Sequence, residues 1–436
     1  MKAVLSDKIY LSVTPEVKAT IKEALTFKLT RTGRGGKRIP YTLVKCIEIR
    51  EEIIAIPIGR EDLIPEGYEV VDKRVTAETK FPEFKLDLRE DQEEIVTQVN
   101  GSAIINAQPS WGKTFCGIAI ASRLKRKTLV VVHTLFLLEQ WISEVKKTLG
   151  IEPGIISSST YNINSPITIT NTQTYKKYAD KLKKEFGTLI LDEAHHSPAS
   201  TFTDILEKSH AKVRIGLSAT LNRKDGLGVL LPGYFSTTIL KPAQANHMKP
   251  RVLYYDTGVE FSDDNSIPWA LRLNDLYNEV DYQNIVLELA HAFSSVHKYP
   301  TLVVSNRIEF LEHLYEILQE DAILVTGATK NRQELIDKVH NGEKSLIFGS
   351  TSIFAEGTNI PILSCLIAAQ PINNDTLIEQ LAGRVSRVHP NKKEPIVIDL
   401  RLQGRTGGKQ AMSRLNTYAR LGYRVDKLPN INDNSV

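Results

Sequence analysis

The clearest chemical signal lies in residues 107–114, Ala-Gln-Pro-Ser-Trp-Gly-Lys-Thr, between an apolar run and a helical pattern. In that setting the backbone N–H groups at a helix N-terminus can bind a phosphate, and Gly112 allows the backbone to approach the anion. Lys113 would place its charge on the β- and γ-phosphates, and Thr114 would offer a hydroxyl to Mg²⁺. Because Ala107 replaces the usual first glycine, a chance Gly-Lys-Thr at a helix start remains an alternative at this point.

Two adjacent carboxylates, Asp192 and Glu193, follow a second apolar run. Ligands of open α/β sheets bind at the C-terminal ends of the strands. There Asp192 can hold Mg²⁺ through water, and Glu193 can orient and deprotonate an attacking water. One acid alone would equally suit the first turn of a helix. Both acids downstream of a phosphate loop favour nucleoside triphosphate hydrolysis.

Short apolar runs that alternate with helical patterns must position these groups. Runs that are apolar at every residue are typical of strands buried on both faces of a parallel sheet. The runs are 103–105, 129–132, 167–169, 189–191, 213–217, 302–304, 323–325, 346–348, 366–369 and 396–398. After the first run, Gly117, Ile120, Ala121 and Leu124 form the expected buried face of a helix. The pattern predicts an α/β fold with two tandem doubly wound parallel-sheet domains.

The length of 436 residues suggests roughly three domains. Residues 1–83 have short strand-like runs and frequent glycine and proline, which predicts a small, mostly β, accessory domain. Residues 84–245 would form the first α/β domain, residues 246–428 the second, and residues 429–436 a tail.

Composition narrows the function classes. The chain is 42% hydrophobic with a net charge of +4, which excludes a disordered chain and gives no global sign of a polyanion partner. Cys46, Cys116 and Cys365 are far apart, so neither disulfides nor a zinc site is expected. No membrane-length apolar run or signal peptide is recognisable. We therefore expect a soluble, cytoplasmic protein.

Further motifs give the chain a resemblance to the superfamily 2 helicases of the DEAH-box type. They are Leu88-Arg89-Glu90-Asp91-Gln92, Val132-His133-Thr134, Asn171-Thr172-Gln173-Thr174, Asp192-Glu193-Ala194-His195, Ser218-Ala219-Thr220, Ser350-Thr351, Glu356-Gly357-Thr358-Asn359 and Gln380-Leu381-Ala382-Gly383-Arg384-Val385-Ser386-Arg387. The motifs span residues 88–399 in the family order. Within this superfamily the chain resembles the branch of XPB and phage UvsW. The resemblance rests on Trp141 after Gln140 and on Asp225-Gly226 after Ser218-Ala219-Thr220.

The resemblance implies two RecA-like domains that bind ATP and Mg²⁺ between them. In the first domain Gln92 would read adenine, and the phosphates would be bound by Ser110, Trp111, Gly112, Lys113 and Thr114. Thr114 and Asp192 would hold the metal. In the second domain Arg384 and Arg387 would reach the γ-phosphate, and Gln380 and Gly357 would belong to the same site.

The resemblance also assigns residues to the nucleic-acid track. His195, Ser218 and Thr220 would couple the ATP site to that track. Thr134, Thr172, Ser350 and Thr351 would contact the bound strand. The resemblance also implies that the protein moves along the nucleic acid in the 3′ to 5′ direction.

Two basic clusters lie outside the motor motifs. Residues 26–50 carry Lys28, Arg31, Arg34, Lys37, Arg38, Lys45 and Arg50, and residues 401–427 carry Arg401, Arg405, Lys409, Arg414, Arg420, Arg424 and Lys427. Such clusters can bind nucleic-acid phosphates without reading sequence, although solvated surface charge is the alternative for each. We expect Arg34, Lys37 and Arg38 to bind nucleic acid.

The leading hypothesis is a monomeric, ATP-dependent DNA helicase or translocase that acts on branched DNA in replication, recombination or repair, in a phage or prokaryotic host cytosol. The alternatives are an RNA helicase, the motor subunit of a restriction or repair nuclease, and a binding module with a decayed ATP site. Intact Lys113, Asp192, Glu193 and Arg387 oppose the last of these.

Overall fold

The structure is a computed structural model that describes residues 1–32, 38–109, 111–194, 206–219, 221, 226–243, 248–355 and 360–428. The chain folds into two units, Met1–Ala245 and Asn246–Val436. The boundary near residue 83, inside the first unit, stays a prediction.

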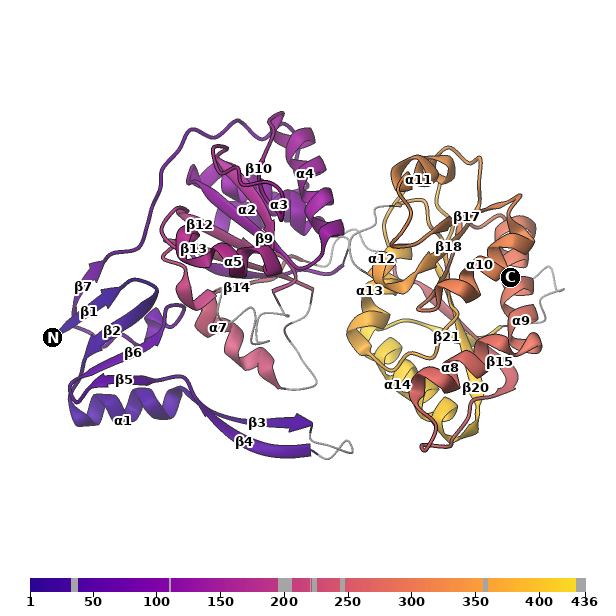
Figure 1. The fold of residues 1–436 in the computed structure, drawn as a ribbon, viewed down its shortest axis with the longest axis horizontal. Coiled ribbons are helices and arrows are strands. Elements are labelled where there is room, and N and C mark those ends of the chain that lie inside the picture. Colours follow the sequence, from indigo (N-terminus) through magenta and orange to yellow (C-terminus); the bar gives the residue numbers. More distant parts are fainter. Residues whose placement is uncertain are drawn as a thin grey trace. The chain divides into compact units, whose positions relative to one another are not determined.

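The N-terminal region is mostly β, as the sequence predicts (Figure 1). Its five-stranded sheet has the order β5-β6-β2-β1-β7. The strands are β1 (Lys2–Leu5), β2 (Lys8–Ser12), β5 (Ile47–Arg50), β6 (Ile53–Pro57) and β7 (Glu69–Asp72), with helix α1 (Pro15–Ala24) and the short helix η2 (Glu61–Leu63). Ile21 of α1 packs on Ile9 and Ile56 of the sheet, which closes a small core.

A separate two-stranded ribbon is formed by β3 (Thr26–Thr32) and β4 (Arg38–Val44). Figure 1 shows this ribbon extending away from the five-stranded sheet. Phe27 pairs with Leu43 and Leu29 with Tyr41, so one face of the ribbon is apolar near its base.

The α/β part of the first unit has a seven-stranded parallel sheet in the order β10-β11-β9-β12-β13-β8-β14. The strands are β8 (Ala103–Asn106), β9 (Thr128–Val132), β10 (Gly154–Ile156), β11 (Ile167–Asn171), β12 (Thr188–Leu191), β13 (Val213–Ser218) and β14 (Ile239–Leu240). The helices are α2 (Glu90–Gln98), α3 (Lys113–Leu124), α4 (Leu135–Leu149), α5 (Thr172–Leu182), η4 (Leu227–Leu230) and α7 (Leu231–Tyr234). All five apolar runs predicted here are strands.

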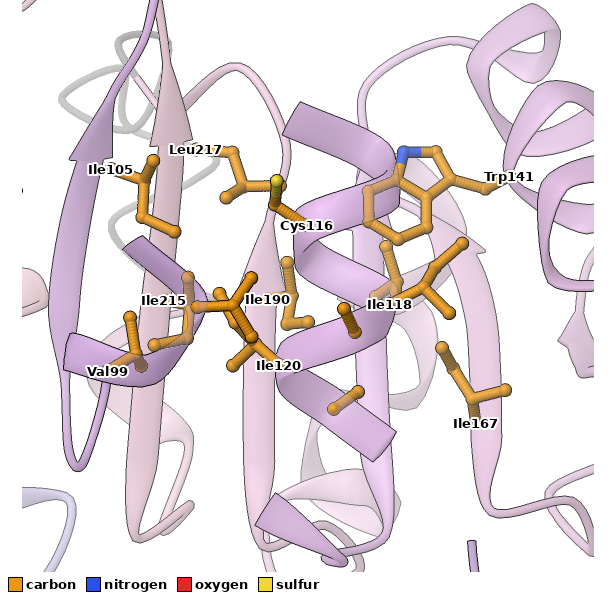
Figure 2. Close-up of a cluster of buried hydrophobic side chains, with 14 of the residues drawn as sticks. Val99, Ile105, Cys116, Ile118, Ile120, Trp141, Ile167, Ile190, Ile215 and Leu217 are labelled. Atoms are coloured by element: carbon orange, nitrogen blue, oxygen red, sulfur yellow. The ribbon is translucent and has the colours of Figure 1, made fainter. Parts of the chain in front are cut away.

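Helix α3 is buried more completely than its sequence pattern predicts. Gly117, Ile120 and Ala121 are buried as expected, but Leu124 is only partly covered. Cys116 and Ile118 are fully buried as well, because α2 and α4 pack against α3 in addition to the sheet. Figure 2 shows this cluster, with Trp141 of α4 beside α3.

The second unit repeats the architecture with a seven-stranded parallel sheet in the order β17-β18-β16-β19-β20-β15-β21. The strands are β15 (Arg251–Glu260), β16 (Thr301–Ser305), β17 (Ala322–Val325), β18 (Leu346–Ser350), β19 (Cys365–Ala368), β20 (Ile396–Gln403) and β21 (Val425–Lys427). The helices are α8 (Trp269–Asn278), α9 (Val280–His291), η5 (Ala292–Val296), α10 (Ile308–Leu318), α11 (Arg332–His340), α12 (Thr351–Ala355), α13 (Asp375–Val385) and α14 (Gly404–Leu421). Two separate apolar clusters include alternate strand residues, so both faces of the sheet are covered. The predicted pair of doubly wound domains is confirmed.

Candidate nucleotide-binding site and motor motifs

The phosphate loop joins β8 to α3. Gly112 is the N-cap of α3 and has a φ of 100°, a backbone conformation that favours glycine. A Cβ atom at Gly112 would lie 2.5 Å from Nε2 of Gln92, so a larger residue would also collide with the neighbouring helix. Beyond Gly112 the first N–H groups of α3 have no intrahelical acceptor, which makes this helix end suited to an anion.

The ammonium of Lys113 is held inside the loop. Its Nζ atom donates to the carbonyl oxygens of Ala107, at 3.1 Å, and Gln108, at 3.3 Å. Thr114 follows in the first turn and is partly exposed. A lysine charge, the N–H groups of a helix N-terminus and a hydroxyl therefore lie together at one loop, and this donor set fits a triphosphate. Ser110, expected to join them, lies outside the described residues.

Helix α2 is clamped to the phosphate loop through Trp111. Gln92 is buried, and its Nε2 atom donates to the Trp111 carbonyl at 2.8 Å. The Trp111 indole N–H donates to Oδ2 of Asp91 at 2.5 Å, and Nη2 of Arg89 donates to the same Trp111 carbonyl at 3.0 Å. Gln92, expected to read adenine, is thus bound to the loop itself. The partners lie about 20 positions apart, so sequence reasoning missed this clamp.

The carboxylate pair lies at the edge of the sheet that carries the phosphate loop. Strand β13 lies between β8 and β12, and all three are parallel, so Lys113, Ser218 and Asp192 follow strand ends at one edge. Ser218 is fully buried, and its carbonyl accepts the Ala107 N–H at 3.0 Å. The structure thus brings together the loop, the predicted metal ligand and one predicted coupling residue.

Asp192 is 4% exposed and is held by two donors. Its Oδ2 atom accepts the Trp141 indole N–H at 2.8 Å, and Oδ1 accepts the Glu193 backbone N–H at 2.9 Å. Burial, and then the charge of Glu193, raise the pKa of Asp192, while Trp141 and Lys113 act in the opposite direction. Glu193 has a φ of 50°, in the left-handed region that non-glycine residues rarely adopt.

The donor set suits a hard cation that binds together with phosphates. Mg²⁺ typically takes one or two carboxylates plus substrate oxygens and water, and Asp192 and Thr114 supply that minimum. Among the described residues there is no group of three or more His, Cys, Asp and Glu side chains able to hold a metal alone.

The predicted strand-contacting residues of the first unit differ in exposure. Thr134 is the N-cap of α4; its hydroxyl accepts the Leu137 N–H at 3.2 Å, and the residue is partly exposed. Thr172 opens α5 but is only 5% exposed, which leaves little of its side chain for a ligand. His195 and Thr220, the other predicted coupling residues, lie outside the described residues.

In the second unit the predicted contact residues Ser350 and Thr351 are buried at the junction of β18 and α12. The Thr351 hydroxyl donates to Oε1 of Gln370 at 2.9 Å, a partner that sequence reasoning missed. Gly357, which follows α12, lies outside the described residues.

Helix α13 carries buried Gln380 and Arg384. Nε of Arg384 donates to the Phe354 carbonyl at 2.7 Å, and Nη2 donates to the Ala355 carbonyl. Arg384 therefore ties α13 to the end of α12. Burial, and then the charge of Arg384, lower the pKa of Arg387 to about 9.

Lys392 is a third cationic residue, close to Arg387, and no sequence motif indicated it. Its Nζ atom donates to the Pro361 carbonyl at 3.0 Å. Burial, and then the charge of Arg387, lower the pKa of Lys392 to about 7. An anion beside these side chains would favour their protonated forms.

Sequence profiles of two families match the chain. The family described as Type III restriction enzyme, res subunit, matches residues 85–223, and the helicase conserved C-terminal domain matches residues 283–389. The probable helicase D10 of Escherichia phage T5 is 40% identical over 98% of this chain and 96% of its own length. The chain belongs to the superfamily 2 helicases. This family consists of ATP-hydrolysing helicases, and the resemblance inferred from the motifs is confirmed at that level.

The chain is also similar to a second sequence relative and to a solved structure. The DNA 3′-5′ translocase XPB2 of Sulfurisphaera tokodaii is 26% identical to this helicase, over 77% of this chain and 86% of the relative. The structure of S. cerevisiae Dbp5 bound to RNA and ADP BeF3 aligns with a TM-score of 0.58 at 14% identity, over 79% of this chain and 90% of Dbp5. The second comparison shows the shared fold.

The C-terminal basic cluster of the helicase is not a uniform phosphate-binding surface. Arg414 is 5% exposed and pairs with Asp399. Arg424 and Arg251 both contact Asp426, at 2.8 and 2.7 Å. Neither alternative left open for this cluster, a phosphate contact or solvated surface charge, applies to Arg414, because its guanidinium is buried inside the second unit.

The N-terminal cluster divides in a similar way. Lys28 and Arg31 are exposed on β3, and Arg31 lies 6.0 Å from the Tyr41 ring. Lys45, in contrast, pairs with Glu207 at 3.1 Å. Arg34, Lys37 and the side chain of Arg38 lie outside the described residues. None of the described helices combines the length and apolar character needed to cross a membrane.

Proposed function

We propose that this helicase is an ATP-driven DNA helicase or translocase that unwinds or branch-migrates branched DNA, such as forks, junctions and R- or D-loops. The observation that carries the proposal is the phosphate loop and the acid pair at one sheet edge, in a chain 40% identical to a phage helicase. A DNA substrate and 3′ to 5′ movement are supported by the relative named a DNA 3′-5′ translocase. A role in replication, recombination or repair in a host cytosol is part of the proposal.

In the proposed reaction Lys113 leaves the Ala107 and Gln108 carbonyls and binds the phosphates of ATP. Asp192 and Thr114 would hold Mg²⁺, and the ion would neutralise phosphate charge. Glu193 orients the attacking water and accepts its proton. Its left-handed backbone conformation, with a φ of 50°, is of the kind that clusters at active sites, which supports this role.

Arg387 is proposed to stabilise the γ-phosphate, a role that suits the planar guanidinium fork. A finger arginine is typically worth about 10³ to 10⁵ in turnover. Arg384, which donates to two carbonyls at the end of α12, would position that helix end, and buried Gln380 lies on the same helix as Arg384. The lowered pKa values of Arg387 and Lys392 support an anion site in the second unit.

The β3–β4 ribbon is proposed to bind DNA phosphates. Its base is anchored, because Phe27 and Leu43 pack on the apolar cluster that includes Leu230 and Tyr234. Beyond the base, Lys28 and Arg31 are exposed, and the connection of the strands contains Arg34 and Lys37. A basic ribbon attached to the ATPase domain would hold one arm of a junction without reading sequence.

The nucleic-acid class is tested by ATPase activity titrated separately with single-stranded DNA, duplex DNA, a four-way DNA junction and RNA at fixed salt. The proposal predicts the strongest stimulation by branched DNA. Strongest stimulation by RNA would establish the RNA helicase alternative instead. Cleavage of any DNA would point to the nuclease-motor alternative.

The ribbon is tested by the salt dependence of junction affinity. Each lost phosphate contact changes the slope of log affinity against log salt by about 0.9 on B-DNA. The double variant Lys28→Ala, Arg31→Ala should flatten the slope by about 2 and leave basal ATPase activity intact. Replacement of Arg34, Lys37 and Arg38 by alanine should flatten the slope by at least as much, again with basal ATPase activity intact. Lys22→Ala with Lys73→Ala removes two exposed charges elsewhere in the N-terminal region and serves as the control. Unchanged slope in both ribbon variants would refute the role.

A further inference from the structure

Trp141 is connected to the proposed metal site by one hydrogen bond. It lies in α4, is fully buried, and donates its indole N–H to Oδ2 of Asp192 at 2.8 Å. An indole N–H is a donor only, so it cannot bind a cation itself, and it occupies one lone pair of Oδ2. The contact therefore orients Asp192 without blocking its remaining lone pairs.

Packing fixes the position of the indole. A Cβ atom at Gly117 of α3 would lie 2.9 Å from Cη2 of Trp141 and 3.2 Å from Cδ1 of Leu217. The absence of a side chain at Gly117 thus leaves space for the ring against α3; Figure 2 shows Trp141 beside this helix. The ring is fully buried against α3, so a shift of α4 relative to α3 would move it with respect to Asp192.

The same helix begins at the predicted nucleic-acid track. Thr134 caps α4, and Trp141 lies two turns further along. A helix moves as a stiff element, so a displacement of its N-terminus by a bound strand would be felt at Trp141. Asp192 would then be reoriented through its Oδ2 atom.

We propose that Trp141 is a positioning residue for the metal-binding carboxylate. Its N–H and the Glu193 backbone N–H hold the two oxygens of Asp192 in the orientation that receives Mg²⁺, and α4 links this orientation to the nucleic-acid track. The inference rests on the proposed function, in which Asp192 binds the metal. Removal of an outer-shell partner of a metal ligand typically costs about 10- to 100-fold in metal affinity or activity.

The first test replaces Trp141 with 3-benzothienylalanine, which keeps the bicyclic shape but substitutes sulfur for the N–H group. The dissociation constant of a slowly hydrolysed ATP analogue is measured with Mg²⁺ and with EDTA. We expect weaker binding by about 10-fold with Mg²⁺ and little change with EDTA. The same replacement at partly exposed Trp269, in the second unit, is the control and should change neither value.

The second test uses the protein without nucleotide. In a sample labelled with ¹⁵N-tryptophan, Asp192→Asn should shift the indole N–H resonance of Trp141, assigned by its loss in Trp141→Phe, more than those of Trp111 and Trp269. DNA added to the wild-type protein should shift the same resonance if α4 transmits strand binding.

These readouts separate the inference from the proposed function. An equal loss of affinity with Mg²⁺ and with EDTA, or a lowered melting temperature with unchanged Mg²⁺ dependence, would show that Trp141 is only a packing residue and would overturn the inference. An Asp192→Asn variant with an unshifted Trp141 resonance would overturn it as well. Absence of DNA-stimulated hydrolysis in the wild-type protein would instead refute the proposed function.

Discussion

Replacement of Arg414 by methionine should destabilise the second unit without removing a DNA contact. Nη2 of Arg414 lies 2.6 Å from Oδ1 of Asp399, and Nε lies 3.0 Å from the same oxygen. Nη2 also donates to the Leu400 carbonyl at 3.0 Å, and Nη1 to the Ile372 carbonyl at 3.2 Å. Burial alone would lower the pKa of Arg414, but the charge of Asp399 raises it overall.

The size of the effect follows from the burial of both side chains, which are 6% and 2% exposed. Removal of one partner leaves an uncompensated buried charge on Asp399, which typically costs about 3–5 kcal/mol of unfolding free energy. At about 2–4 °C per kcal/mol for a unit of this size, the unfolding transition of the second unit should fall by about 6–20 °C.

This shift is measured by calorimetry, from the unfolding transition of the second unit. The slope of log DNA affinity against log salt is measured in parallel. Arg420→Met is the matched control, because Arg420 is 51% exposed and 3.6 Å from Glu379; an exposed pair is worth about 0–1 kcal/mol. Arg414→Met combined with Asp399→Leu should regain most of the loss, since no charge stays buried alone. The structural role would be refuted if Arg414→Met unfolded within about 2 °C of the wild type and its salt slope were flatter by about 0.9. That result would show instead that Arg414 contacts a DNA phosphate.

Three further predictions concern the ATP chemistry. Lys113→Ala should abolish ATP hydrolysis with an unchanged circular dichroism spectrum, because its charge-assisted phosphate contacts are lost; turnover near the wild-type rate would contradict the phosphate-loop assignment. Glu193→Gln should bind nucleotide and DNA tightly but stall, since an amide can orient water but cannot take its proton; unimpaired steady-state hydrolysis would exclude the general-base role. Arg387→Ala should lower kcat while a fluorescent nucleotide still binds, because the lost interaction with the γ-phosphate is made in the transition state. A changed nucleotide affinity with unchanged kcat would exclude this role as an arginine finger.

The buried strands could be predicted from sequence because every residue of each run is apolar. Ile104 and Ile105, for example, face opposite sides of the first sheet and both are fully buried, which only a strand covered on two faces allows. The order of motifs likewise predicted the loop, the acid pair and their common sheet edge, since parallel strands end at one edge.

Side-chain contacts between distant elements could not be predicted. The Trp141–Asp192 bond depends on the rotation of α4 about its axis and on the space left by Gly117, and neither is encoded in the spacing of the two residues. Arg414 could not be distinguished from the exposed cations of its cluster, because a run of basic residues does not reveal which one is buried. Its partner Asp399 lies on β20, in a run recognised only for its apolar residues.

Several groups assigned to the nucleotide are bound to backbone carbonyls in this structure. Lys113 donates to Ala107 and Gln108, and Gln92 donates to Trp111. Where a ligand takes over one of these N–H groups, a bond to a carbonyl is exchanged rather than added, since a buried donor left without an acceptor is costly. For Lys113 the exchange replaces neutral carbonyls by phosphate oxygens, which is a gain because charge-assisted bonds are stronger. For Gln92 it would replace one neutral acceptor by another, so a contact with adenine would contribute selectivity for the base and little affinity. Release of the Trp111 carbonyl by Gln92 would remove one of the bonds between α2 and the phosphate loop, and base recognition would then reach the phosphates through Trp111.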